Sequence, residues 1–163
     1  MIKLLRIDQR LVHGQVATYW VRSTEADTMV VINDKAATDS MTKMSLKLGK
    51  PAGVRFEILT LKDGIDYINS PSNKKRKILI IVGNCKDGRK VCENSPEVAD
   101  VNIGGIHYED GRVSITNQVF LTQEDLDELD KMEAYGKNVF LQSIPNEQKI
   151  YLKEVHEIYN KNK

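Results

Sequence analysis

Cysteine, net charge and long apolar runs are scarce in this 163-residue chain, and each scarcity narrows its function. The two cysteines, Cys85 and Cys92, form neither a C-x-x-C pair nor a metal-ligand spacing with the histidines, so we interpret both as reduced thiols. A net charge of +1 from 24 basic and 23 acidic residues gives no long-range field for nucleic acid or an anionic membrane. No run reaches the ~20 apolar residues of a membrane span, and no signal-peptide core is present at the start. These absences predict a cytoplasmic protein whose chemistry is local.

The size and composition are those of one globular domain. With 40% hydrophobic and 29% charged residues, a chain of this length buries roughly 70% of the surface that its unfolded form exposes. No internal repeat and no linker divides the sequence. We therefore predict a single domain over residues 1–163.

Short apolar runs alternate with segments of helical spacing along the whole chain. The runs that predict strands cover residues 2–7, 28–33, 54–59, 78–82, 100–105 and 139–144. The run 78–82 (I-L-I-I-V) is unbroken and aliphatic, as expected for a central strand buried on both faces. The alternation predicts an α/β fold, a doubly wound and mostly parallel sheet with helices on both faces. We expect one antiparallel hairpin, formed by 106–108 and 113–116 around an Asp110-Gly111 turn.

The helical segments carry recognisable caps and apolar faces. Thr60 and Thr122 are each followed three residues later by an aspartate, which is typical of a helix start. In the segment that begins at Thr38, three residues recur at helical spacing and are assigned to the core rather than to a binding surface; they are Met41, Met44 and Leu48. The basic run 74–77 is interpreted as a solvated loop.

The stretch 6–16, R-I-D-Q-R-L-V-H-G-Q-V, concentrates the chemically useful side chains. His13 follows a predicted strand and precedes a predicted helix, where free backbone N–H groups and the helix dipole favour an anion. Gly14 permits a positive φ or a close backbone approach, and Gln15 supplies a further donor. These positions predict an anion pocket.

The charged residues of the same stretch fit phosphoryl chemistry. Arg6 and Arg10 remain protonated and can neutralise phosphate oxygens, whereas a neutral imidazole at His13 can act as a nucleophile. Asp8 can hold the imidazole N–H or one of the arginines, which would fix the tautomer. Residue types alone also allow a plainer interpretation, in which His13 is structural and the arginines form an ordinary ion-pair cluster with Asp8.

Polar residues and glycines stand at two further strand ends. Asn33 and Asp34 follow the second predicted strand at the carboxyl edge, where open α/β sheets bind ligands, although a helix N-cap is their commoner role. Gly104 and Gly105 end the fifth predicted strand, where a backbone can approach a ligand or simply turn. Both pairs are candidates for the rim of the site.

The stretch 6–16 closely resembles the signature of enzyme IIB components of the mannose/fructose/sorbose family of the bacterial sugar phosphotransferase system. The segments V-V-I-N-D (30–34) and V-N-I-G-G-I (101–106) are similar to that family's in order and separation, so the resemblance covers nearly the whole chain. Three features depart from the family, which usually has a proline near Cys85, glycines where Asn94-Ser95-Pro96-Glu97 stand here, and a lysine where Asn117 stands.

The resemblance implies a function and a set of partners. His13 would accept a phosphoryl group from a phosphohistidine on a separate IIA protein and pass it to the sugar entering through the membrane IIC/IID components. Arg10 and Arg6 would neutralise the phosphate, Asp8 would orient the ring, and the pair Asn33-Asp34 would border the site. No metal or cofactor is required, the protein would associate peripherally with the permease, and a homodimer is compatible with this function. The resemblance does not identify the sugar.

Two other functions compete with a phosphoryl relay. One is a non-catalytic α/β module that holds a small anion beside His13 without covalent transfer. The other is a receiver domain phosphorylated on aspartate, which needs paired acids after the first strand, an acceptor aspartate after the third and a lysine after the fifth. The chain has only Asp8, then Thr60-Leu61-Lys62, then glycines at these places, so the receiver pattern fits poorly.

Overall fold

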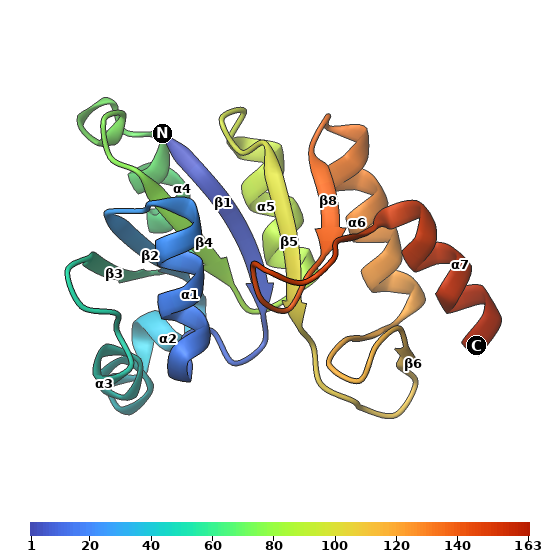
Figure 1. The fold of residues 1–163 in the computed structure, drawn as a ribbon. Helices are drawn as coiled ribbons and strands as arrows, with labels where there is room; N and C mark the ends of the chain where they lie inside the picture. Colours follow the sequence, from blue (N-terminus) through green and yellow to red (C-terminus); the bar gives the residue numbers. More distant parts are fainter.

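The protein forms one seven-stranded sheet with the strand order β3-β2-β4-β1-β5-β8-β9, and a separate two-stranded ribbon (Figure 1). The structure is a computed structural model and describes residues 1–163. The strands of the large sheet are β1 (Ile2–Asp8), β2 (Thr28–Ile32), β3 (Arg55–Leu59), β4 (Ile78–Val82), β5 (Asp100–Gly105), β8 (Asn138–Leu141) and β9 (Ile150–Tyr151). All pair in parallel except β9, which runs antiparallel to β8. The predicted fold class is confirmed.

Helices cover both faces of the sheet. The helices are α1 (Gly14–Thr24), α2 (Asp34–Thr38), α3 (Ser40–Leu48), α4 (Leu61–Asn69), α5 (Cys85–Asn94), α6 (Gln123–Ala134) and α7 (Leu152–Asn162), with a 3-10 turn, η1, at Pro71–Asn73. In Figure 1, α1 crosses in front of the sheet, whereas α5 and α6 lie behind it. No helix has the length and hydrophobicity of a membrane-spanning segment.

Two apolar cores follow from this layering. A cluster of 27 buried residues includes Ile7 and Val82 from the sheet and Leu129 from α6. A smaller cluster of 13 residues, on the other face, packs Ala17 and Trp20 of α1 against the sheet. All five residues of β4 are buried, as predicted for the central strand. The cores hold the carboxyl ends of β1, β4 and β5 at one edge of the molecule.

The helix caps agree with the sequence patterns. Thr60 accepts a hydrogen bond from the backbone N–H of Asp63, and Thr122 and Asp125 form a reciprocal capping box. The closing helix α7 buries Leu152, Val155 and Tyr159 as predicted. These local signals depend on residues three or four apart, which explains why the sequence alone reveals them.

The predicted hairpin is wrong in its pairing. The Asp110-Gly111 turn forms, with Gly111 at φ +90°, but the ribbon consists of β6 (Val113–Ser114) and β7 (Phe120–Leu121). Ile106 does not pair with the segment 113–116. Its N–H donates to the Gln118 carbonyl, and its carbonyl accepts the N–H of Phe120. The turn between β6 and β7 is closed by the Thr116 hydroxyl, which accepts from the N–H groups of Gln118 and Val119. The antiparallel pair therefore forms around the turn that begins at Thr116, C-terminal to the predicted turn at Asp110-Gly111, because the Thr116 hydroxyl stabilises that turn.

The core assignment of the α3 methionines is also wrong. Met41 is 81%, Met44 67% and Leu48 85% exposed, whereas Leu46 is buried. Helix α3 packs mainly beside the short helix α2 rather than lying flat on the sheet, so only a narrow side of it faces inward. Neither α2 nor β9 was predicted, because both are too short to show a repeating pattern of apolar residues.

Candidate functional site

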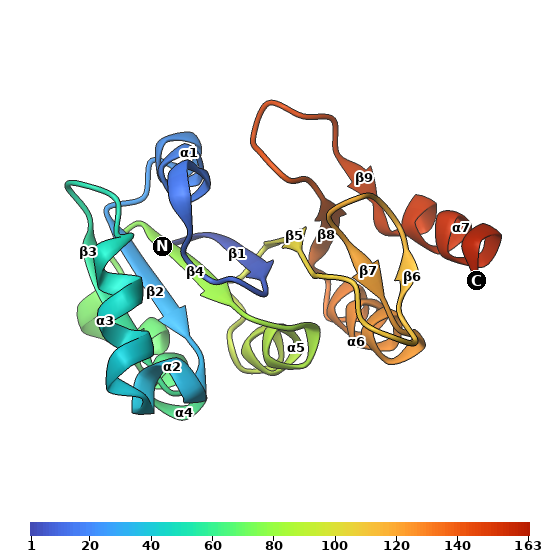
Figure 2. The same cartoon turned by 90° about the horizontal axis from the view of Figure 1, so that it is seen from below.

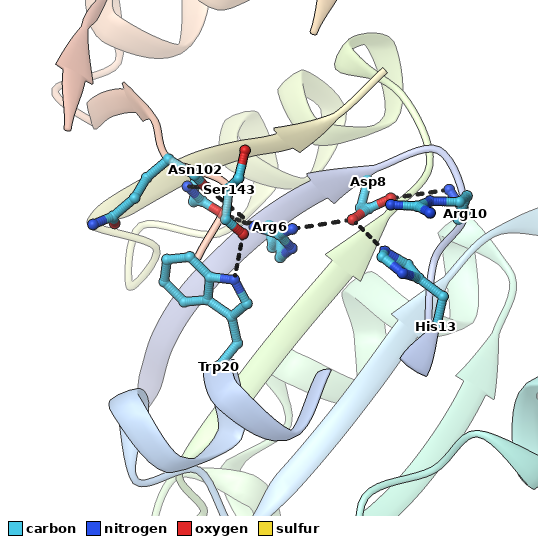
Figure 3. Close-up of polar contacts among 8 residues, drawn as sticks. Arg6, Asp8, Arg10, His13, Trp20, Asn102 and Ser143 are labelled. Atoms are coloured by element: carbon cyan, nitrogen blue, oxygen red, sulfur yellow. Dashed lines mark hydrogen bonds and ion pairs between the residues drawn. The ribbon is translucent and has the colours of Figure 1, made fainter. Parts of the chain in front are cut away.

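Strand β1 delivers the first two charged residues of the site. Because side chains alternate along a strand, Arg6 and Asp8 point to the same side of the sheet at its carboxyl end. The guanidinium Nη2 of Arg6 donates to Oδ2 of Asp8 at 3.1 Å. The side chain of Asp8 is only 1% exposed, so a carboxylate is held in the interior by partners on all sides (Figure 3).

His13 stands at the N-cap of α1, and its ring turns back toward the strand. Extended backbone at His13 (φ −151°, ψ 136°) and a positive φ of +50° at Gly14 start the helix immediately after the ring. The ring Nε2 lies 2.9 Å from Oδ2 of Asp8, and Nδ1 makes no hydrogen bond within the chain. The side chain is 21% exposed. One ring nitrogen is therefore held by the protein while the other is unengaged.

The connection between Asp8 and His13 is folded tightly over the carboxylate. Oδ1 of Asp8 accepts the backbone N–H of Arg10 at 3.0 Å, and the Asp8 carbonyl accepts the N–H of Leu11 at 2.9 Å. Leu11 adopts φ +62°, a left-handed conformation that costs a non-glycine residue roughly 1–2 kcal/mol. The Arg10 side chain is exposed and lines an open cleft with Gly105, His107 and Tyr108. Arg10 is thus the guanidinium of the site that solvent reaches.

The structure buries Arg6, which the sequence predicts as a phosphate-binding residue. Its side chain is 4% exposed, and Nη1 donates to Oδ1 of Asn102 at 2.6 Å and to the Gln142 carbonyl at 3.3 Å. Its guanidinium carbon also lies 5.1 Å from the centre of the Trp20 ring. These partners surround the buried guanidinium, and its Nη2 is bound to the Asp8 carboxylate.

The electrostatics of the cluster keep Asp8 ionised. Burial by itself would raise the pKa of the Asp8 carboxyl, but the hydrogen bond from His13, the Arg6 charge and the Arg10 N–H together lower it below its ordinary value. Burial lowers the pKa of Arg6, and the Asp8 carboxylate opposes that shift. The ionised Asp8 carboxylate can only accept a hydrogen bond, so its contact with Nε2 selects the His13 tautomer that has its N–H at Nε2.

The remaining predicted residues lie at different depths. Gly14 and Gln15 are exposed in the first turn of α1. Asn33 caps α2 by accepting the N–H of Ala36, and Oδ1 of Asp34 accepts the N–H of Leu61 at 2.8 Å. The N-cap role weighed for this pair is thus confirmed for Asn33, and Asp34 instead ties α2 to the start of α4.

The glycine pair packs against the charged cluster, and Gly105 also lines the open cleft beside Arg10. A Cβ added to Gly104 would be 2.1 Å from Cζ of Arg6, and one added to Gly105 would be 3.3 Å from Oδ1 of Asp8. Both glycines are buried. Their missing side chains make room for the Arg6–Asp8 pair.

Several supporting residues could not be found from the sequence. Asn102 also donates through Nδ2 to the Gln142 carbonyl, and Trp20 donates to the Ser143 carbonyl at 3.2 Å, so the segment after β8 closes over Arg6. Gln9 accepts the N–H of His107 through its side chain, which joins the loop before His13 to the loop after β5. The only available signal was the asparagine within the apolar strand 100–105, since a buried amide needs a partner. No group of three or more His, Cys, Asp or Glu side chains is arranged to hold a metal ion.

Comparison with known proteins decides the family. The model of the PTS system sorbose subfamily IIB component matches residues 2–163. The chain belongs to this family. It is 31% identical over 161 residues to a probable phosphotransferase enzyme IIB component of Streptococcus pyogenes serotype M6, covering 95% of this chain and 99% of the relative. It is 33% identical to the N-acetylgalactosamine-specific phosphotransferase enzyme IIB component 1 of Escherichia coli K12, covering 91% and 94%.

Solved IIB structures share the fold. The manxB structure from Thermoanaerobacter tengcongensis has a TM-score of 0.91 and 28% identity, covering 98% of this chain and 96% of that one. The IIBSor domain of the Klebsiella pneumoniae sorbose permease also has a TM-score of 0.91, at 24% identity, with 96% and 97% covered. The mannose-specific EIIAB component of E. coli K12 is 27% identical, and this chain matches 95% of its own length but only 48% of that protein. The protein is thus a IIB component of the sugar phosphotransferase system, a system in which such components work with IIA and membrane IIC/IID partners.

Proposed function

We propose that His13 carries the phosphoryl group on Nδ1, accepting it from a phosphohistidine of a IIA protein and giving it to a sugar held by the IIC/IID permease. The observation that carries this proposal is the engagement of Nε2 by Asp8 at 2.9 Å, because it leaves Nδ1 as the ring nitrogen with a free lone pair. The partial exposure of the ring lets a second protein reach that atom.

The transfer exchanges one phosphorus–nitrogen bond for another. The lone pair of Nδ1 attacks phosphorus, the bond to the donor imidazole breaks, and its electron pair returns to the donor ring. The ring of His13 then bears phosphorus on Nδ1 and hydrogen on Nε2, so it becomes cationic. The Asp8 carboxylate lies directly against that Nε2–H and stabilises the new charge.

Arg10 and the start of α1 serve the phosphoryl oxygens. The Arg10 side chain is exposed beside the ring, and its backbone is pinned by Asp8. The first turn of α1 has no acidic residue, and the His13 side chain does not cap its N–H groups. These donors, the Arg10 charge and Gln15 together neutralise the transferring group without a metal or nucleotide, since the donor already contains an activated phosphoryl group.

Arg6 acts through Asp8 rather than on the phosphate. It holds the same carboxylate oxygen that receives the His13 Nε2–H, and Asn102 and the Gln142 carbonyl fix it in turn. In this arrangement Arg6 is a positioning residue, and Gly104 provides its space. In the second step a sugar hydroxyl attacks phosphorus and releases its proton to solvent, the bond from phosphorus to Nδ1 breaks with its electron pair returning to the ring, and His13 is again the neutral imidazole.

Labelling with the cognate phosphorylated IIA tests this proposal. We expect an acid-labile, alkali-stable label on His13, abolished in His13→Ala and retained in His156→Ala, whose ring pairs with Asp130 away from the site. Nitrogen-15 NMR of the labelled ring should assign phosphorus to Nδ1. A label on another residue, or none despite an active donor, would contradict the proposal and favour the non-catalytic anion-binding module.

A further inference from the structure

Helix α3 exposes three large apolar side chains on one face. Met41, Met44 and Leu48 are spaced by three and four residues, which places them in a line along the helix, and each is at least 67% exposed. We call these three residues the α3 stripe. Single exposed apolar residues are ordinary, but a contiguous line of three is typical of an interaction surface. Methionine side chains in particular adapt to the shape of a partner.

The α3 stripe ends beside the proposed phosphoryl site. Gly49, which follows Leu48, packs against Val12, since a Cβ added there would lie 3.7 Å from Cγ1 of Val12. Val12 is the residue immediately before His13. Figure 2, a view onto the carboxyl edge of the sheet, shows α3 on one side of the connection between β1 and α1 and the loops around β6 and β7 on the other. A partner centred on His13 therefore reaches α3 first on that side.

The surroundings of the α3 stripe carry a surplus of positive charge. Lysines 43, 47 and 50 lie on or just after α3, and the exposed side chain of Arg10 lies in the same loop as Val12. The acidic residue at the start of α3 is engaged, because Asp39 accepts the N–H of Thr42 to cap the helix. The surface next to His13 thus combines an apolar line with basic side chains.

We propose that the α3 stripe is the docking surface for the phosphorylated IIA donor. This inference rests on the proposed function, because it assigns a surface to the partner that delivers the phosphoryl group to His13. Transfer requires the donor phosphorus within about 3–3.5 Å of Nδ1. A standard interface buries roughly 800 Å² on each partner around such a point, an area that extends onto α3, whose C-cap Gly49 lies beside Val12.

Charge selects the donor among the partners that could cover this face. The donor arrives with an anionic phosphoryl group at its centre, which matches the lysines and Arg10, and electrostatic attraction of this kind mainly raises the association rate. The permease meets the surface after the anionic phosphoryl group has been transferred to His13, so the same lysines are then partly neutralised by the protein's own phosphate. Three apolar residues on a nine-residue helix also give little area for holding a bilayer.

The test compares a protein donor with a small one. The variant Met41→Gln/Met44→Gln/Leu48→Gln keeps side-chain length and helix propensity while removing the apolar line. Its phosphorylation is measured with the cognate phospho-IIA and, separately, with phosphoramidate, which needs no docking surface. The control is Tyr135→Gln, an exposed aromatic residue three positions before β8 and hence at the opposite, amino edge of the sheet.

The outcomes separate docking from chemistry. We expect the second-order rate constant with phospho-IIA to fall at least about tenfold in the triple variant, with the phosphoramidate rate within about twofold of wild type and the control unchanged. An unchanged rate with phospho-IIA overturns the inference, as does an equal loss with both donors. A defect confined to transfer into permease-containing vesicles, or to binding of anionic lipid vesicles, also overturns it. Failure of the wild-type protein to be labelled on His13 by either donor would instead overturn the proposed function.

Discussion

The Arg6 guanidinium fills the space that a side chain on Gly104 would need: a methyl group on Gly104 would lie 2.1 Å from Cζ of Arg6. The glycine is the condition for burying the guanidinium beneath Asp8. This relationship links a backbone position on β5 to the ring that we propose carries the phosphoryl group.

Gly104→Ala should therefore displace Arg6 from Asp8. We expect a loss of about 1–3 kcal/mol in the free energy of unfolding, measured by urea titration, and slower phosphoryl acceptance by His13. The control is Gly49→Ala, where an added Cβ has no neighbour closer than 3.6 Å. Equal stability of the two variants would show that Arg6 can move aside without penalty.

Asp8→Asn should destabilise the protein in a pH-dependent manner. The folded-state pKa of Asp8 is lowered, so its stabilising effect is complete above the unfolded-state pKa of about 3.9 and is lost as the pH falls through the folded-state pKa. At pH 7 the asparagine leaves the buried Arg6 without its counter-charge, which typically costs about 3–5 kcal/mol.

Urea titrations of wild type and Asp8→Asn from pH 7 down to pH 3 measure this difference. The gap between the two proteins should narrow as the wild-type carboxylate becomes protonated. Asp66→Asn is the comparison, because the Asp66 side chain is 70% exposed and its pair with Lys62 contributes little. A gap that stays constant with pH would contradict the assigned ionisation.

Arg10→Ala should slow phosphoryl acceptance while leaving the fold intact. Removing a charge that stabilises the transferring group typically costs about 10²–10³ in rate, and Arg10→Lys should recover part of it because the charge remains without the planar fork. The backbone N–H that binds Asp8 is retained in both variants. Rates at saturating phospho-IIA measure the effect, with Arg22→Ala, exposed at the end of α1, as the control. Normal rates in Arg10→Ala would remove Arg10 from the mechanism.

The two thiols should be inert in the folded protein. Burial, followed by the charges of Asp125 and Glu128, raises the pKa of Cys85 well above its ordinary value, and burial raises that of Cys92 to about 11. At pH 8 we expect iodoacetamide to modify neither thiol of the native protein within minutes. In protein denatured with urea it should modify both, as mass spectrometry would show. Rapid modification of native Cys85 would show that its end of α5 opens readily.

The parts of this structure that the sequence predicts are those set by neighbours along the chain. Strand and helix alternation, the caps at Thr60 and Thr122, and the buried β4 all depend on short-range patterns. The contact of Asp8 with His13 spans only five residues and was among the two alternatives considered for Asp8. The tight turn between Asp8 and His13 brings the ring back to the carboxylate, so this contact depends on neighbouring residues alone.

The features that the sequence does not predict depend on contacts between segments that are far apart along the chain. Arg6 and Arg10 are equivalent as residue types, yet Arg6 is buried because Asn102 and Gln142, 96 and 136 residues away in sequence, close over it. Helical spacing likewise identified the line of Met41 and Leu48 but not the side of α3 that faces inward, which Leu46 occupies. Burial of a charge or exposure of a methionine is decided by distant segments.

The two oxygens of Asp8 have different partners: one receives the His13 ring and the Arg6 guanidinium, and the other receives the Arg10 backbone. A single carboxylate consequently sets both the orientation of the His13 ring and the placement of the Arg10 backbone. Changes at Asp8 and Arg10 should then be strongly non-additive in a double-mutant cycle, because the first already disorders what the second removes. Any redesign of this IIB component for a new partner has to keep the Asp8 carboxylate and change residues farther from it.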